Sequence, residues 1–100
     1  MLQERVKDPR CVRVSIRLGD GQVPWIRLNE RRFELPFGSI RLVARLVGVN
    51  LRNNPDLREV EVGNPHRLRG KADIGSVIEA LREVILASGR SMEFSAMLGV

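Results

Sequence analysis

Arginines lie on either side of the chain's single tryptophan, in two strand-like segments near the N-terminus. Arg13 and Arg17 are four residues apart in the first segment, and Arg27 follows Trp25 by two in the second. Side chains two or four apart in a strand point to the same face of a sheet. A guanidinium makes planar, bidentate contacts with phosphate, and an exposed indole can stack on a base. The pattern therefore predicts a sheet face that binds nucleic acid.

A second group of basic residues, Arg67, Arg69 and Lys71, lies in a loop at residues 63–72 that contains no aspartate or glutamate. The loop leads into a predicted helix, and the free amides of a helix N-terminus favour an anion. We expect these three residues to contribute to the same nucleic-acid site. The spacing of a phosphate-binding P-loop is absent.

Acidic residues on the later strands compete with this interpretation. The alternation places Glu34, Glu59, Glu61 and Glu93 on the same sheet face as the arginines. Opposite charges there favour cross-strand ion pairs, worth about 0.2–1 kcal/mol each. They would also suit docking of the basic half of the face onto the acidic half of a second copy. The sequence leaves all three alternatives open.

The alternative function is protein assembly, as a homodimer or as a subunit of a larger complex. The last predicted strand runs nearly to the C-terminus and ends in Met97, Leu98 and Val100. An apolar edge strand invites pairing with another chain. Together with Trp25 these residues form the predicted interface of this second hypothesis.

Composition restricts the other function classes. The chain has 100 residues, 43% of them apolar, a net charge of +5 and one cysteine, which predicts a folded domain without an internal disulfide in a reducing, cytoplasmic compartment. No apolar run is long enough to span a membrane. Neither a catalytic triad nor a metal-ligand cluster nor a dinucleotide fingerprint is present. We therefore predict a non-enzymatic domain without metal or cofactor.

The segments that must position these residues predict an α+β fold. Residues 73–89 have the clearest helical periodicity, with Asp73 as N-cap and Gly89 at the C-terminal end. Alternating segments predict strands at residues 12–18, 25–28, 33–35, 59–62 and 92–98. We expect residues 11–35 to form an antiparallel meander with turns at 19–22 and 29–32.

A second helix is predicted from the Ser39 N-cap to about Val47, ended by Gly48 and Asn50 and followed by a polar loop at 51–56. Residues 40–57 share the spacing of the first half of a helix-turn-helix, but Pro55 leaves no room for a recognition helix. The predicted fold is one mixed sheet of about five strands, in the order strand–strand–strand–helix–strand–helix–strand, with both helices on one face. Residues 1–10 are a polar lead-in, and residues 11–100 form a single domain.

Overall fold

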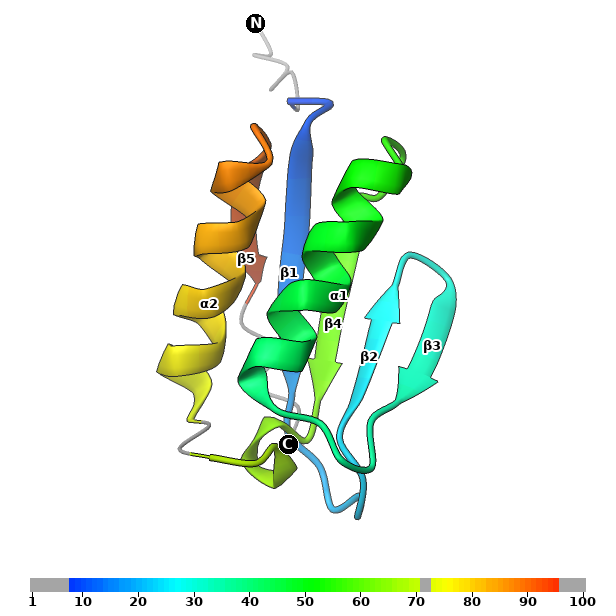
Figure 1. Cartoon of the computed structure of the whole chain (residues 1–100), viewed down its shortest axis with the longest axis vertical. Helices are drawn as coiled ribbons and strands as arrows, with labels where there is room; N and C mark the ends of the chain where they lie inside the picture. The colour runs from blue at the N-terminus through cyan, green and yellow to red at the C-terminus, as the bar shows by residue number, and fades with distance from the viewer. Residues whose placement is uncertain (1–7, 71–72, 96–100) are drawn as a thin grey trace, which may run out of the picture.

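The structure is a computed structural model that describes residues 8–70 and 73–95. In this part of the chain, five strands form one mixed sheet in the order β3-β2-β4-β1-β5. The two α-helices lie side by side over one face of that sheet (Figure 1), which confirms the predicted fold class. The elements are β1 (Cys11–Arg17), β2 (Trp25–Leu28), β3 (Arg31–Glu34), α1 (Ile40–Asn53), β4 (Glu59–Gly63), the 3-10 helix η1 (Pro65–Arg67), α2 (Ile74–Ala87) and β5 (Ser91–Ser95).

The order of the strands differs from the predicted meander. β1 does not pair with β2, because β4 lies between them, parallel to β1 and antiparallel to β2. Adjacent β1 and β2 would have brought arginines together on one face, whereas β4 places Glu59 opposite Arg13 and Glu61 opposite Arg27. Opposite charges across a strand pair stabilise it, and like charges destabilise it. The hairpin of β2 and β3 is the part of the meander that the structure confirms.

The core lies between the sheet and the helices. Alternate residues of β1, β2 and β4 point toward the helices and are almost completely buried, as period-two alternation predicts. The two helices contribute apolar residues spaced four apart, which is the stripe expected of an amphipathic helix. The buried apolar side chains of these elements are Val12, Val14, Ile16, Ile26, Leu28, Val60 and Val62 from the sheet, and Val43, Val47, Leu51, Val77, Leu81 and Ile85 from the helices.

The helix α1 is longer than predicted, because it continues through Gly48 and Asn50 to Asn53. Gly48 faces α2, and a Cβ at this position would lie 2.8 Å from a Cγ of Val84. The glycine therefore permits close packing of the two helices rather than ending one of them. The additional turn buries Leu51, so apolar burial outweighs the low helix propensity of glycine and asparagine. The predicted polar loop at 51–56 is correspondingly wrong at its start.

The boundaries of the other elements follow local chemistry. Asp73 caps α2 by accepting a hydrogen bond from the Ser76 amide at 2.8 Å, and Gly89 has the predicted positive φ of 77°. β3 begins at Arg31, so the turn before it is two residues long and places Asn29 at φ 55°. The Asn29 side chain accepts hydrogen bonds from the amides of Arg58 and Glu59, which ties this turn to the start of β4. Residues 96–98 of the predicted last strand lie outside the described residues.

Candidate nucleic-acid interface

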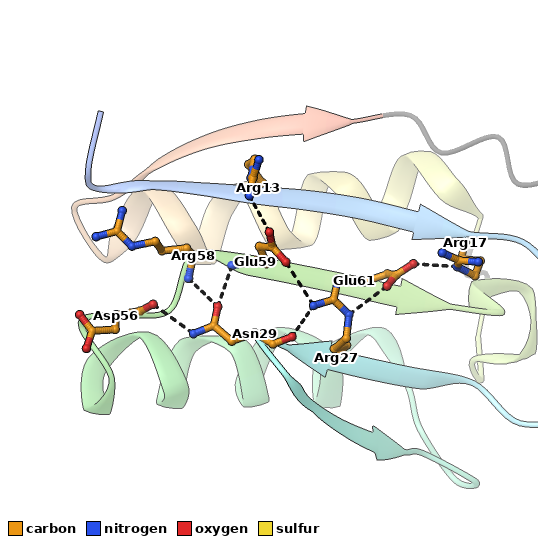
Figure 2. A network of polar contacts seen from close by, with 8 residues as sticks. All are labelled: Arg13, Arg17, Arg27, Asn29, Asp56, Arg58, Glu59 and Glu61. Carbon is orange, nitrogen blue, oxygen red and sulfur yellow. Dashed lines mark hydrogen bonds and ion pairs between the residues drawn. The ribbon is translucent and has the colours of Figure 1, made fainter. Parts of the chain in front are cut away.

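The sheet face opposite the helices carries the predicted arginines. Arg13 and Arg17 of β1 and Arg27 of β2 flank the two carboxylates of β4 (Figure 2), so the predicted placement on one face is confirmed. We call Arg13, Arg17, Arg27, Glu59 and Glu61 the sheet-face network.

Each of these arginines is bound to a carboxylate. Arg13 Nη2 lies 2.5 Å from Glu59 Oε2, and Arg17 Nε lies 2.8 Å from Glu61 Oε2. Arg27 joins the two pairs, because its Nη1 lies 3.2 Å from Glu59 Oε1 and its Nε lies 3.1 Å from Glu61 Oε1. Arg27 also donates a hydrogen bond to the Asn29 carbonyl (Figure 2). The sequence left three alternatives open for this face: nucleic-acid binding, cross-strand ion pairs and docking onto a second copy. The structure shows the cross-strand ion pairs.

Glu61 is the most deeply buried member of the network, with 7% of its side chain exposed. Burial alone would raise the pKa of this carboxyl, but the hydrogen bonds from Arg17 and Arg27, together with their positive charges, lower it below its ordinary value. Glu61 is therefore ionised, and it holds the two guanidinium groups in place. A phosphate that approached this face would compete with a carboxylate already in contact.

Trp25 is not an open stacking platform. Its indole lies over Gly63 of β4, where a Cβ would come within 1.9 Å of Trp25 Cε2. The guanidinium carbon of Arg32 lies 4.3 Å from the centre of the ring, which is a cation–π contact. The half-buried tryptophan is therefore packed between a neighbouring strand and an arginine side chain.

The basic loop lies beside the start of α1, which the sequence did not predict. The Arg69 amide donates a hydrogen bond to the Gly38 carbonyl at 2.9 Å, and Ser39 and Arg69 form an isolated parallel bridge. Leu68 is buried between the two segments, close to Gly38. Arg67 and Arg69 remain exposed on either side of this anchor. Lys71, the third predicted residue of the loop, lies outside the described residues.

Three further arginines lie on the exposed side of α1. Arg41, Arg45 and Arg52 are four and seven residues apart, so they project from the same side of the helix, and all three are exposed. Residues 35–55 contain no acidic residue. Within residues 8–70 and 73–95, none of these arginines forms an ion pair with a carboxylate, and the same is true of the two loop arginines.

Phe37 adds an aromatic ring to this region. It lies in the connection between β3 and α1, and 78% of it is exposed. Gly38 and Ser39, which follow it directly, are the residues that contact the basic loop. The segment Pro36-Phe37-Gly38 before the Ser39 N-cap was the available sequence signal for an exposed aromatic residue. We call Phe37, Arg41, Arg45, Arg67 and Arg69 the basic helix–loop surface.

Of the four residues predicted for the assembly interface, the structure describes only Trp25. Trp25 is packed as described above, and Met97, Leu98 and Val100 lie outside the described residues.

Cys11 is the first residue of β1 and is half-buried as a free thiol. The described residues include no group of three or more histidine, cysteine, aspartate or glutamate side chains arranged to hold a metal ion. No helix in the described ranges has both the length and the apolar character needed to cross a bilayer.

Comparison of the chain with known protein families, curated proteins and solved structures finds no match.

Proposed function

We propose that this domain binds nucleic acid through the basic helix–loop surface and catalyses no reaction. The observation that carries the proposal is the contact between two acid-free segments, residues 35–55 and 62–72, at Ser39 and Arg69. This contact brings exposed arginines of α1 and of the basic loop to one end of the helix. Their guanidinium groups are available to an external anion.

The chemistry of this surface suits a phosphate backbone. Arginine presents a planar fork of donors that matches two phosphate oxygens. Neutralising phosphates releases the counterions condensed on the nucleic acid, which drives binding at low salt. Phe37 offers an exposed ring face beside the arginines, and stacking on a base is worth about 1–3 kcal/mol. The positive end of the α1 dipole favours an anion at the same place.

In this proposal the main binding role belongs to the helix–loop surface and not to the sheet face. The sheet-face arginines Arg13, Arg17 and Arg27 would have to exchange Glu59 and Glu61 for phosphates. These ion pairs argue against the predicted binding role of the three arginines. A cytoplasmic location belongs to the proposal as well, since one free cysteine favours a reducing compartment.

The salt dependence of binding tests the proposal. We expect nuclease-treated protein to bind labelled single-stranded DNA or RNA, measured by fluorescence anisotropy over a range of salt concentrations. Four arginines that each neutralise one phosphate predict a log–log slope of about −3 on single strands. The triple variant Arg41→Ala/Arg45→Ala/Arg69→Ala should reduce the magnitude of that slope by about two.

The matched control removes the same charge from elsewhere on the surface. The variant Arg31→Ala/Arg58→Ala/Arg82→Ala also loses three exposed arginines and should keep most of the slope. Absence of binding to either nucleic acid at low salt would overturn the proposal. Equal losses in the two variants would also overturn it, because net charge rather than this surface would then explain binding.

A further inference from the structure

The strand β3 forms one edge of the sheet and is open to solvent along its whole length. All four of its residues are exposed, and neither helix covers it in Figure 1, where it extends beyond α1. An open edge strand has unpaired backbone groups to which another strand can bind.

The ladder with β2 identifies which backbone groups of β3 point outward. The Leu35 amide donates to the Pro24 carbonyl at 2.7 Å, so residues 24 and 35 are a hydrogen-bonded pair. Hydrogen-bonded and non-hydrogen-bonded pairs alternate in an antiparallel ladder. With the observed register, the amides and carbonyls of Phe33 and Arg31 face β2, and those of Arg32 and Glu34 face away from the sheet.

We propose that two copies of this chain form a dimer by antiparallel pairing of their β3 strands about a two-fold axis at Phe33. In this register Arg32 of each copy lies opposite Glu34 of the other, and the outward backbone groups of both residues exchange hydrogen bonds. Two five-stranded sheets would then form one continuous sheet. The two Arg32–Glu34 pairs would lie on the face opposite the helices.

Charge pairing favours this register over the two registers in which one strand is shifted by two residues along the other. Shifting the axis to Arg32 would set two arginines opposite each other, and shifting it to Glu34 would set two glutamates opposite each other. Registers shifted by one residue would face the outward backbone groups with inward ones. Neither Arg32 nor Glu34 forms an ion pair within the described parts of its own chain. The Arg32 guanidinium lies over the Trp25 ring, but like the Glu34 carboxylate it has no partner of opposite charge among the described residues.

Phe33 supports the same axis. Its side chain lies on the face of the sheet that carries the helices, and 38% of it is exposed. Phe33 would face its symmetry mate in a non-hydrogen-bonded pair, where Cα atoms approach to about 4.5 Å and side chains are closest. Arg31, whose guanidinium carbon lies 5.3 Å from the centre of the Phe33 ring, would flank the contact.

Charge reversal tests the dimer. We expect the mass of nucleic-acid-free protein, measured by light scattering and sedimentation, to rise from 11.3 kDa toward twice that value with concentration. Arg32→Glu and Glu34→Arg each create two like-charge pairs and should weaken self-association by about tenfold or more. Circular dichroism should show that both variants remain folded.

Two rescue experiments separate charge from loss of stability. The double variant Arg32→Glu/Glu34→Arg restores opposite charges and should regain the wild-type dimer, although it also lacks the Arg32 contact with Trp25. An equimolar mixture of the two single variants should form a heterodimer, because each glutamate then faces an arginine. A monomer at every concentration would overturn the proposal. So would a dimer that neither single variant weakens, or a double variant that remains as weak as the singles.

Discussion

The sheet-face network and the basic helix–loop surface both contain several arginines, but their surroundings differ. In the network, five charged side chains alternate in sign across β1, β4 and β2, and every arginine contacts a carboxylate. On the helix–loop surface the arginines come from acid-free segments and remain exposed. The first group holds together strands that are far apart in the sequence, and the second is available to an external anion.

This difference shows why arginine content is a weak guide to function. The sheet face has the more suggestive sequence pattern, with arginines around a tryptophan. It is nevertheless the face on which the arginines are already paired and the indole is covered. The arginines are paired because of the strand order, which places the glutamates of β4 between the arginines of β1 and β2.

The largest effect on stability should come from breaking the sheet-face network at Glu61. Replacement Glu61→Gln leaves two guanidinium groups without their shared carboxylate and should lower the free energy of unfolding by about 1–3 kcal/mol. Urea denaturation measures this change. The matched control Glu83→Gln alters an exposed glutamate of α2 and should stay within about 0.5 kcal/mol.

Urea denaturation of a variant on the helix–loop surface provides the comparison with the sheet-face network. Arg45→Ala on the helix–loop surface should also remain within about 0.5 kcal/mol of the wild type, since no contact within the described residues depends on its charge. If Glu61→Gln and Arg45→Ala destabilised the protein equally, the arginines of the helix–loop surface would contribute to stability as much as the sheet-face network does. That result would contradict the proposed difference between the two regions.

A smaller effect should appear in the dependence of stability on pH. The folded state lowers the pKa of Glu61 from its ordinary 4.5, so the stabilisation is complete above about pH 4.5 and is lost as the pH falls through the lower folded pKa. The wild type and Glu61→Gln should therefore differ most near neutral pH and converge in acid. A difference that stays constant from neutral to acidic pH would show that ionisation of Glu61 is not the cause.

Other carboxyls contribute acid sensitivity to both proteins. The Ser76 amide lowers the pKa of Asp73 at the start of α2, and hydrogen bonds from the Arg10 amide and the Ser91 hydroxyl lower that of Asp8. The comparison of Glu61→Gln with the wild type removes these shared contributions, because both proteins retain them.

Much of the fold was predictable, because its signals are local. The periodicity of α2, its Asp73 cap and the alternation in β1, β2 and β4 identify the elements and the face that each buries. The misplaced end of α1 has a long-range cause, since Gly48 is favourable there only because Val84 packs against it. The insertion of β4 between β1 and β2 depends on pairing across more than 30 residues.

The candidate site was predictable in part. The sequence located the basic loop, but the position of this loop beside Arg41 of α1 depends on the Gly38–Arg69 hydrogen bond between distant segments. The placement of Arg13, Arg17 and Arg27 on one face followed directly from alternation. Their engagement by Glu59 and Glu61 was one of three open alternatives until the strand order was known.

We propose that nucleic acid contacts the helix–loop surface and leaves the sheet-face network intact. The most direct test is a nuclear magnetic resonance titration of isotope-labelled protein with a short single-stranded oligonucleotide at low salt. We predict that the amide signals of residues 37–45 and 66–70 shift with added oligonucleotide, while those of residues 11–17, 25–28 and 59–63 change little. The largest shifts at residues 11–17, 25–28 and 59–63 would contradict the claim, because the arginines paired with Glu59 and Glu61 would then be the ones that bind.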